Sequence, residues 1–538
     1  MMAAQPLSPS AIGSWHCPIC GLTNKYRILC QGCYTGAPYE YRQLIISKCK
    51  ETLSKHNQAQ VFDHINTIQS LRLLNDLILQ IKSIDFPLIN KLYERGMREE
   101  KEIESKGAKL SPFPHSDAYN ISTIGDVPKL IASGFRAIAA GKCCVIILAG
   151  GQGTRLGFER PKGCYPIGAK SGKSIYQLLI EKALAIKRLA AQHQGIDDLA
   201  QIRFPLYFMT SSATHGETQS FLNQNQYFRY DFQDIHLFQQ DLFPCLTEQD
   251  GKFIMETASS IAMSPNGNGG IYSSLKSSGI YRSMIENHIE YIQVFGIDNI
   301  LARIGDPLWY GHMIESKADC SNKTCIKRDP HEKIGIMCLR NGKPAVTEYT
   351  ELTKDMVEMK QKANANELEY CYGNLAMHQF HIDFISKICN DIKEEYPLPI
   401  HIARKKIPFC HAKTMKTVQP EQPNGIKLEF FVFDTFQYSN KCTVYNILRE
   451  EEFAPVKNAK GNDSPRTARV AVSNYWKKQI MKHGGAFSND KDGNIDDLIC
   501  EVSPLFAYLP YADPLFKKRV NGKTFTLPVY LEYDPQTL

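Results

Sequence analysis

The sequence predicts an α/β protein whose central sheet is mainly parallel, twisted and flanked by helices. Short apolar runs of strand length alternate with helical stretches between about residues 140 and 435. The first run is apolar throughout, which is typical of a parallel strand that is buried on both faces. Alternation of strands with helices favours a parallel sheet, because the chain crosses over after each strand and starts the next one in the same direction. The runs lie at residues 143–148, 206–210, 235–238, 291–297 and 334–339.

The chain divides into four predicted parts. Residues 11–38 hold a compact group of cysteines, and residues 41–135 form a helical region with apolar side chains at helical spacing. Residues 136–440 contain the alternating strands and helices. Residues 441–538 mix short apolar runs with turns, which indicates a small terminal domain that contains strands. The apolar residues at helical spacing are Leu71, Leu74, Leu77, Ile78 and Ile81.

Length and composition limit the class of protein. The 538 residues are enough for two to four domains. A net charge of +7 suits the binding of small polyanions and is not the dense basic stripe of a nucleic-acid-binding domain. Residues 1–10 lack the pattern of a signal peptide, and no apolar run approaches the roughly 20 residues that cross a bilayer. Reduced cysteines and a cytoplasmic protein without a membrane partner are therefore expected.

Four cysteines near the N-terminus have the spacing of a structural zinc site. Two Cys-x2-Cys pairs are separated by nine residues, and two such pairs of thiolates can hold Zn²⁺ tetrahedrally. With Trp15 and Asn24, the segment resembles the RanBP2-type zinc finger, which implies ubiquitin or RNA as a partner. It has five residues between Asn24 and the third cysteine, one fewer than that pattern, and a purely structural cap or an oligomer contact stays an alternative. The cysteines are Cys17, Cys20, Cys30 and Cys33.

The most informative segment is a glycine-rich turn that follows the apolar run 143–148. Its glycines bring backbone amides close to a ligand, where side chains would block the approach. Arg155 and Lys162 add two cations, and the turn ends in Pro-Lys-Gly. A strand, a glycine turn and two cations predict a phosphate site, which we expect to hold a nucleoside triphosphate. The glycines are Gly150, Gly151, Gly153 and Gly157.

Spacing excludes two commoner phosphate-binding loops. The P-loop requires Lys-Ser or Lys-Thr after its last glycine. The dinucleotide fingerprint requires two residues between its second and third glycines, whereas three separate Gly153 from Gly157. The segment from Gly168 to Ser174 is one residue too short for a P-loop and follows no apolar run. We predict that it is a loop leading into a helix at residues 175–189.

A series of further motifs follows the glycine turn in a fixed order. They are Phe238-Gln239-Gln240, Pro265-Asn266-Gly267-Asn268-Gly269-Gly270, Ile297-Asp298-Asn299, Asp306-Pro307, Gly335, Glu348-Tyr349, Gly373-Asn374, Asn424-Gly425-Ile426-Lys427-Leu428-Glu429 and Glu452-Phe453-Ala454-Pro455-Val456-Lys457-Asn458. This series resembles the eukaryotic UDP-N-acetylglucosamine pyrophosphorylases, also called UDP-N-acetylhexosamine pyrophosphorylases, over roughly residues 120–510. The zinc finger is not part of that family pattern.

The resemblance implies a uridylyltransferase with a Rossmann-like nucleotidyltransferase fold. Such an enzyme joins UTP to N-acetylglucosamine 1-phosphate, releases pyrophosphate and requires Mg²⁺. The attacking sugar phosphate is already an anion and needs no general base. Catalysis therefore reduces to aligning the nucleophile with the leaving group and neutralising negative charge. Lysines, an arginine, backbone amides and a metal suit this task, and the motifs carry such groups.

For the nucleotide, the resemblance implies contacts from the glycine turn and from two later motifs. Arg155 and Lys162 are implied to hold the triphosphate as catalytic groups. Gln240 can pair with the uracil edge, because one amide offers both a donor and an acceptor. Gly267 lets the base lie against the backbone. The residues of the turn that line the nucleotide are Leu148, Ala149, Gly150 and Gly151.

Asp298 directly follows the apolar run 291–297, and open α/β sheets bind ligands at this end of their strands. Its carboxylate is a hard oxygen ligand suited to Mg²⁺ that bridges phosphates. By resemblance, Lys427 is a catalytic lysine beside the α-phosphate, and Lys457 reaches the sugar phosphate.

The resemblance also implies a set of sugar-binding residues. Glu348 can accept hydrogen bonds from ring hydroxyls, and Asn374 can pair with the N-acetyl group. The family usually has Asp where this chain has Asn266, but Asn keeps the geometry and we expect activity to survive. His378 is expected to pack in the core. The implied set is Asn268, Gly335, Glu348, Tyr349, Asn374 and Lys457.

Two alternatives stay open. Another UDP-sugar pyrophosphorylase would use N-acetylgalactosamine or glucose 1-phosphate, because the sequence does not place the C4 hydroxyl against Asn268 or Glu348. An adaptor is the other alternative, with a finger that binds ubiquitin or RNA and a large domain that only senses nucleotide. Retention of charged residues at both ends of the phosphate site argues against a nucleotide sensor.

Overall fold

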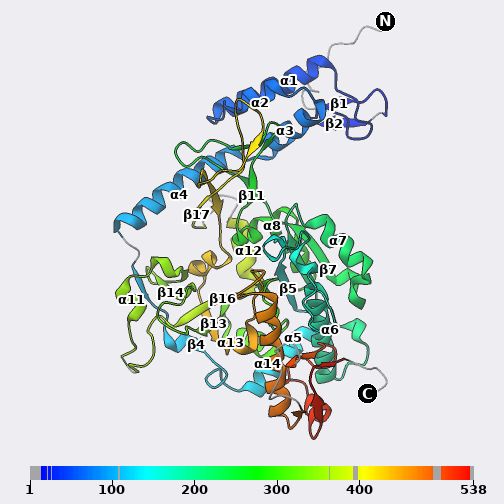
Figure 1. Cartoon of the computed structure of the whole chain (residues 1–538), viewed down its shortest axis with the longest axis vertical. Coiled ribbons are helices and arrows are strands. Elements are labelled where there is room, and N and C mark those ends of the chain that lie inside the picture. Colours follow the sequence, from blue (N-terminus) through cyan, green and yellow to red (C-terminus); the bar gives the residue numbers. More distant parts are fainter. Residues whose placement is uncertain are drawn as a thin grey trace. The chain divides into compact units, whose positions relative to one another are not determined.

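The computed structural model describes residues 14–20, 22–25, 27–106, 109–362, 364–391, 398–488 and 498–532. The chain forms two compact units, each built from three separate stretches of sequence (Figure 1). The first unit comprises Met1–Gly107, Asp241–Gly270 and Pro399–Phe431, and the second comprises Ala108–Gln240, Ile271–Leu398 and Val432–Leu538.

The second unit is organised around an 11-stranded sheet. Along the main path of this sheet, all strands run in one direction except β16, which pairs antiparallel with both of its neighbours, β12 and β13. The predicted mainly parallel α/β fold is confirmed. In path order the strands are β4 (Ala118–Tyr119), β21 (Cys442–Asn446), β13 (Cys320–Ile326), β16 (Tyr372–His381), β12 (Tyr291–Gly296), β5 (Cys143–Leu148), β6 (Leu206–Thr210) and β7 (Ile235–Gln239), with β14 (Ile336–Arg340), β15 (Lys343–Thr347) and β3 (Leu110–Pro112) at the side.

Five helices of the second unit, α5, α6, α10, α11 and α14, begin at a polar residue whose side chain caps them. Ser174 Oγ accepts a hydrogen bond from Gln177 N at the start of α6, and Gly195, in the left-handed conformation, ends this helix. The helix predicted at residues 175–189 is thus confirmed and extends further. Apolar side chains of α5, α6 and α10 share one core with β5 and β6. The helices are α5 (Val127–Ala139), α6 (Ile175–Gln194), α7 (His215–Gln224), α8 (Ile271–Ser277), α9 (Ile280–Glu286), α10 (Pro307–Ser316), α11 (Lys354–Glu358), α12 (Ile382–Asp391), α13 (Arg449–Glu452), α14 (Pro465–Lys482) and α15 (Phe516–Val520).

One predicted run forms a strand outside the main path of the sheet. The run at residues 334–339 overlaps β14, which turns back at Asn341 and Gly342 to pair antiparallel with β15. Both turn residues have positive φ, 52° and 75°. An Asn-Gly pair adopts these values readily in a two-residue hairpin. The turn chemistry, rather than a crossover helix, therefore sets the direction of the next strand, β15, relative to β14.

The C-terminal residues also belong to the second unit. β21 is a member of the large sheet, and side chains of α14 and α15 join the same core as α6. Two short parallel pairs complete this region: β22 (Ala486–Ser488) with β24 (Thr524–Thr526), and β23 (Cys500–Val502) with β25 (Val529–Leu531).

The P-loop-like segment at residues 168–174 holds a carboxylate of the chain itself. The backbone amides of Lys170 and Ser171 donate to Oε2 of Glu501 at 2.5 and 3.1 Å, and the Ser171 hydroxyl donates to Oε1 at 2.6 Å. Successive amides in a turn bind anions well. The segment is a loop before α6, as predicted, and its anion partner is Glu501 of β23.

The first unit consists of helices and short antiparallel strand pairs. The apolar residues that predict a helix near residues 71–81 lie on α3, and of them Leu74, Leu77, Ile78 and Ile81 are buried. The helices are α1 (Tyr39–Lys55), α2 (Val61–Thr67), α3 (Leu71–Ser83) and α4 (Phe86–Lys106). The strand pairs are β1 (Ser14–His16) with β2 (Thr23–Lys25), β8 (Leu242–Pro244) with β11 (Met263–Pro265), β9 (Met255–Thr257) with β10 (Ser260–Ile261), β17 (His401–Lys405) with β20 (Gly425–Glu429), and β18 (Phe409–Cys410) with β19 (Thr417–Val418).

Two glutamines connect these helices to the strands that come from later in the sequence. The Gln58 side chain donates to Gly251 O at 3.0 Å and accepts from Phe253 N at 2.8 Å. Gln80 makes the same pair of bonds with Ile261, donating at 2.9 Å and accepting at 2.8 Å. Each amide thus replaces a peptide group and fixes residues 241–270 onto the N-terminal helices.

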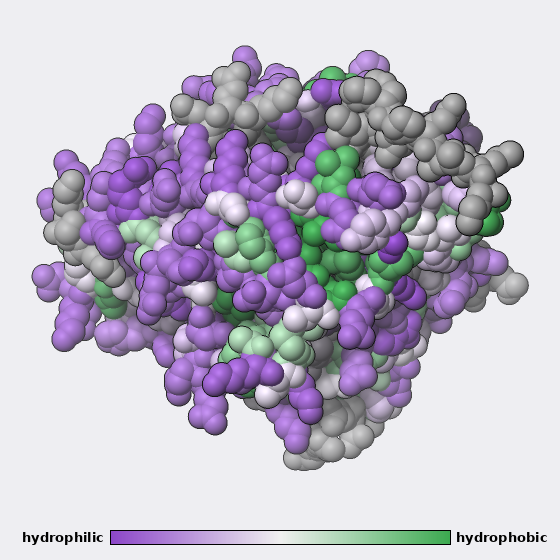
Figure 2. Space-filling view, turned by 90° about the horizontal axis from the view of Figure 1, so that it is seen from above, coloured by the Kyte–Doolittle hydropathy of each residue, from purple (hydrophilic) through white to green (hydrophobic). Residues whose placement is uncertain are grey.

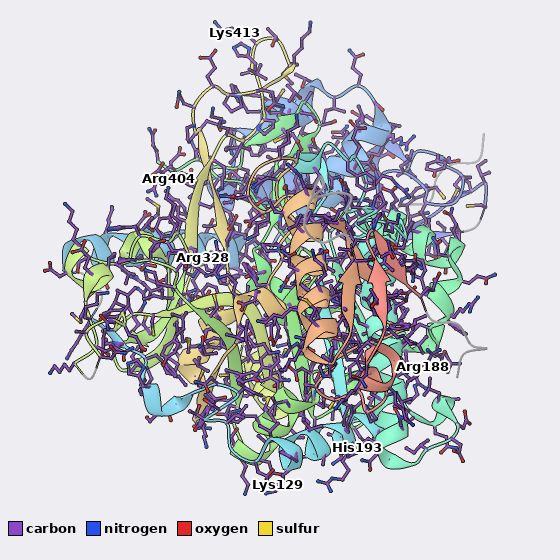
Figure 3. All side chains as sticks on the ribbon, turned by 60° about the horizontal axis from the view of Figure 1, so that its bottom comes forward. Lys129, Arg188, His193, Arg328, Arg404 and Lys413 are labelled. Atoms are coloured by element: carbon purple, nitrogen blue, oxygen red, sulfur yellow. The ribbon has the colours of Figure 1, made fainter. Side chains whose placement is uncertain are left out.

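The described surface is rich in charged side chains. On the face shown in Figure 2 most described residues are hydrophilic, with smaller groups of hydrophobic ones between them. Figure 3 labels Arg404 of β17, whose guanidinium group bonds both carboxylate oxygens of Glu100 on α4 at 2.7 and 2.8 Å. Among the described residues, no helix combines the length and the apolar character needed to span a bilayer.

Candidate active site

Several predicted site residues meet at one edge of the large sheet. β5 and β12 are parallel neighbours with Leu148 opposite Gly296, and Ile297 N donates to Leu148 O at 3.1 Å. The glycine turn and Asp298 therefore leave the sheet side by side, at the carboxyl ends of their strands. Open α/β sheets bind ligands at this edge.

Hydrogen bonds within the loop fix the glycine turn. Gly153 N donates to Arg160 O at 2.9 Å, and Lys162 N donates to Gly151 O at 3.1 Å. A Cβ on Gly153 would lie 2.7 Å from Phe158 O, so the tight turn requires glycine there. Gly151 is exposed, and a Cβ on it would meet nothing within 4 Å. Its backbone is therefore open to a ligand.

Three charged side chains act on Lys162 beside the turn. Lys162 is half-buried, and burial lowers the pKa of its ammonium group. The Asp298 carboxylate raises this pKa, whereas Lys457 and Arg155 lower it further. Asp298, Lys457 and Arg155 therefore lie within electrostatic range of Lys162. We call these four residues the charged cluster. Three cations outweigh one anion in this cluster, so it favours a polyanionic ligand.

Asp298 could hold a divalent cation. It is half-buried, and a Cβ on Gly296 would lie 2.6 Å from its Oδ1. The carboxylate thus occupies space that glycine leaves free at the end of β12. One carboxylate beside a phosphate site is the donor set that Mg²⁺ uses when it also bridges phosphates. The residues present fit this ion.

Gln240 lies next to the glycine turn. It follows β7, and its backbone N donates to Thr210 O at 2.7 Å. Its Oε1 is 3.4 Å from the position that a Cβ on Gly150 would take. The side chain is therefore well placed to form hydrogen bonds with a group that lies against Gly150.

Three of the predicted sugar-binding residues lie together. Asn374 N donates to Gly335 O at 2.7 Å, and a Cβ on Gly335 would lie 3.5 Å from Oε1 of Glu348. Tyr349 follows Glu348 and is 38% exposed. Asn374 lies near the start of β16, which runs antiparallel to β12, so this group is at the same edge of the sheet as Asp298.

The other predicted residues, Gly267, Asn268 and Lys427, belong to the first unit. Gly267 has φ +82°, and a Cβ on it would lie 2.3 Å from Phe430 O. Only glycine fits at this close approach. Asn266 is fully buried, and its carbonyl accepts from Phe430 N at 2.9 Å. A neutral amide costs less to bury than a carboxylate would.

A buried group of ion pairs in the second unit was not predicted as functional. Lys323 of β13 is fully buried and bonds Asp306 and Glu452 at 2.7 and 2.5 Å. Burial alone would raise the pKa of Asp306, but Lys323 and Arg303 bring it below its ordinary value. Asp306 and Glu452 stand in the quoted motifs, whereas no local pattern marks Lys323. Its role depends on partners that are distant in the sequence.

His378 packs in the core as predicted. It is 1% exposed, and its Nδ1 lies 2.9 Å from Oδ1 of Asn322. Burial lowers its pKa to about 3, so the ring is neutral.

The four N-terminal cysteines form a candidate zinc centre. Their sulfur atoms all lie within 4.8 Å of one another, with Cys17 Sγ 3.3 Å from Cys33 Sγ and Cys20 Sγ 3.4 Å from Cys30 Sγ. A tetrahedral site with Zn–S bonds of about 2.3 Å needs a group of this size. The residues therefore fit zinc.

Trp15 and Asn24 stabilise the finger from within. Trp15 is 3% exposed and donates from Nε1 to Arg27 O at 2.8 Å. Asn24 is 1% exposed and accepts from Gln31 N at 3.0 Å. Asn75 of α3 accepts from Ile28 N at 3.1 Å, so the finger is joined to the helices of the first unit.

We expect Cys30→Ser to remove zinc from the full-length chain without removing catalysis. The hydroxyl is a poor zinc ligand, and three thiolates bind the ion more weakly than four. Zinc content by elemental analysis should fall from one ion per chain to a small fraction. Thr35→Ala is the matched control in the same segment, since it removes a hydroxyl 3.1 Å from Cys33 Sγ but no ligand. Loss of turnover in step with zinc would contradict an accessory role for the finger.

The fold and the charged cluster define a nucleotide-binding α/β protein of the nucleotidyltransferase type. The chain belongs to the UTP–glucose-1-phosphate uridylyltransferase family, whose pattern matches residues 86–482. This family membership confirms the resemblance drawn from the motifs.

Individual relatives are more specific. The chain is 35% identical over 491 residues to UDP-N-acetylglucosamine diphosphorylase 2 of Arabidopsis thaliana, a match that covers 89% of this chain and 92% of the relative. It is 36% identical over 414 residues to human UDP-N-acetylhexosamine pyrophosphorylase-like protein 1, covering 74% and 79% of the two chains. A crystal structure of the UDP-N-acetylglucosamine pyrophosphorylase of Trypanosoma brucei with an inhibitor matches with a TM-score of 0.75 at 26% identity, over 91% of this chain and 98% of that one.

Proposed function

We propose that the chain is a uridylyltransferase that forms UDP-N-acetylglucosamine and pyrophosphate from UTP and N-acetylglucosamine 1-phosphate. The observation that carries the proposal is the charged cluster beside the glycine turn, at the ligand-binding edge of the sheet. The named activities of the relatives support the choice of nucleotide and sugar.

The reaction needs alignment and charge more than proton transfer. An anionic oxygen of the sugar phosphate attacks the α-phosphorus, a new P–O bond forms, and the bond to the bridging oxygen breaks as pyrophosphate leaves. Lys162 and Arg155 neutralise the phosphates, and the open amide of Gly151 donates to them. Asp298 would hold Mg²⁺, which when bound would supply further positive charge. Lys457 holds the incoming sugar phosphate in line.

We assign the recognition of UTP and of the sugar phosphate to different residues at the carboxyl ends of the parallel strands. The Gln240 amide pairs with uracil. Glu348 accepts from ring hydroxyls, Asn374 pairs with the N-acetyl group, and Gly335 leaves room for the ring. The parts of Leu148, Ala149, Gly150, Gly267, Asn268, Tyr349 and Lys427 in binding stay predictions.

Steady-state rates on a panel of sugar 1-phosphates test the proposed function. We expect pyrophosphate release with UTP to be fastest for N-acetylglucosamine 1-phosphate and to depend on Mg²⁺. A rate for glucose 1-phosphate that is equal or higher would overturn the N-acetyl assignment. Equal use of N-acetylgalactosamine 1-phosphate would broaden it to hexosamines. Absence of pyrophosphate release with every sugar would favour the adaptor.

The partner of the zinc finger stays a prediction. Trp15 is buried and is not available to stack on a base, whereas Ile19 and Tyr34 are 71% and 67% exposed. Exposed groups of this kind suit a protein partner such as ubiquitin, and the Tyr34 ring can also stack on an RNA base. Titration of the full chain with ubiquitin and with single-stranded RNA, followed by fluorescence anisotropy, separates the two. A cytoplasmic location likewise stays a prediction.

A further inference from the structure

The turn that follows Asp298 is joined to the segment that precedes Lys457. Val456 N donates to Asp298 O at 2.9 Å, and Ile300 N donates to Ala454 O at 3.2 Å. These bonds flank the antiparallel bridge between Asn299 and Pro455. Asp298 thus lies in a short ladder of backbone bonds, and Lys457 directly follows the other segment of this ladder.

The side chain of Asn299 fastens this ladder. It is 4% exposed, and its Nδ2 donates to Glu452 O at 2.8 Å. Its Oδ1 accepts from Ala454 N at 2.9 Å and from Leu301 N at 3.3 Å. A single amide therefore satisfies backbone groups on both segments, which a hydrocarbon side chain cannot do.

The Glu452 side chain also fixes the segment that precedes Lys457, through two ion pairs. It is fully buried, and its Oε2 lies 2.5 Å from Lys323 Nζ. Its Oε1 lies 3.1 Å from Arg303 Nη1, and Arg303 follows Asn299 by four residues. The carboxylate of one segment is thereby paired with a cation of the other. Buried pairs of this kind are weak evidence for stability but can specify one arrangement.

Lys182 of α6 is the third group that holds the turn after Asp298. Its ammonium group donates to Ile300 O at 2.6 Å and to Ala302 O at 3.0 Å. Burial lowers its pKa to about 7, and a neutral amine still has the two protons that these bonds need. The turn is therefore held from the sheet, from α6 and from the Lys457 segment.

We propose that Asn299 and Glu452 are positioning residues that keep the Asp298 carboxylate and the Lys457 loop at a fixed separation. The inference rests on the proposed function, since it assigns the metal to Asp298 and the sugar phosphate to Lys457. Both side chains are buried and bonded to other groups of the chain. They act by holding the carboxylate and the ammonium group in line with the phosphates, where a displacement of about 1 Å costs roughly 10²-fold in rate.

Asn299→Ala and Glu452→Gln test the inference in the full-length chain. We expect kcat to fall about 10- to 100-fold in each, with the KM values for UTP and for the sugar phosphate within about threefold of wild type. Electron paramagnetic resonance of Mn²⁺ with UTP, without sugar phosphate, gives a readout that does not require turnover. We expect the dissociation constant of Mn²⁺ to rise about 10- to 100-fold, as for residues that orient a metal ligand.

Ser473→Ala is the matched control. Ser473 is 2% exposed and accepts from Cys500 N at 2.9 Å, so its removal also deprives a buried amide of its partner in the second unit. We expect it to lower the melting temperature while leaving kcat and Mn²⁺ affinity unchanged. Variants of Asn299 and Glu452 that lose only thermal stability, as this control does, would overturn the inference.

The two variants break different contacts, so each gives an independent result if the other fails to fold. Wild-type protein that binds Mn²⁺ with UTP but releases no pyrophosphate would overturn the proposed reaction. Weaker Mn²⁺ binding by the variants would then still support the positioning role. Unchanged Mn²⁺ affinity with normal folding would overturn that role, whatever the reaction.

Discussion

Lys162→Ala is expected to lower kcat about a thousandfold, which corresponds to about 4 kcal/mol in the activation barrier. The lysine is half-buried beside the glycine turn, with Asp298 as its counter-charge and two further cations in range. A charge fixed in such a place stabilises the transition state at the α-phosphorus more than the bound substrate. Pyrophosphate release at saturating UTP and sugar phosphate measures the effect.

The same residue should shape the alkaline side of the pH profile. Burial lowers the pKa of Lys162, so its proton is lost at a lower pH than that of an exposed lysine. Activity should therefore decline on the alkaline side as the positive charge disappears. Arginine keeps its charge to a higher pH, and Lys162→Arg should move the decline to higher pH even if kcat is reduced.

Lys170→Ala is the matched control for this variant. Lys170 is an exposed lysine on the loop before α6, and its backbone amide, not its ammonium group, bonds Glu501. We expect wild-type kcat and an unchanged pH profile. Equal losses in both variants would mean that Lys162 acts only through net charge.

Asp298→Ala should reduce kcat about a hundred- to a thousandfold and weaken the response to Mg²⁺. A metal ion contributes several kcal/mol of charge stabilisation to such a transition state, and each 1.4 kcal/mol is worth about a factor of ten in rate. Titration of activity with Mg²⁺ measures the change. We expect no concentration of Mg²⁺ to restore wild-type turnover.

Asp126→Asn provides the control for the carboxylate. Asp126 Oδ1 accepts from Lys129 N at 3.1 Å at the start of α5, and Asn caps a helix as well as Asp does. This variant should keep both kcat and the Mg²⁺ response. A wild-type Mg²⁺ response in Asp298→Ala would show that the ion is bound elsewhere.

Strands β5 and β6, helix α3 and the zinc centre could be predicted because their signals are local. Burial on both faces leaves continuous apolar runs in β5 and β6, and burial of one face leaves the helical spacing of α3. The four cysteines are recognised by spacing alone, and the structure brings their sulfur atoms together. Each of these features depends on neighbours in the chain.

The polar strand β13 could not be predicted in this way. Its buried residues include Ser321, which accepts from Trp309 Nε1 at 2.9 Å, and Lys323, which is paired with carboxylates. Buried polar groups are tolerated because partners satisfy them, and here one partner of Lys323, Glu452, is far along the chain. The residues of the charged cluster are predicted separately, Arg155 and Lys162 from the glycine turn and Asp298 and Lys457 from the motif series. The ladder that holds Asp298 next to Lys457 emerges only in three dimensions.

The interleaved sequence of the first unit has a consequence for synthesis. Helices α1–α4 leave the ribosome early. The backbone groups that Gln58 and Gln80 hydrogen-bond belong to residues 251–261, which are made much later. The pair β17–β20 follows only when residue 429 has been made. The unit therefore closes late in translation, after most of the large sheet has emerged, and its early helices present apolar faces to chaperones until then.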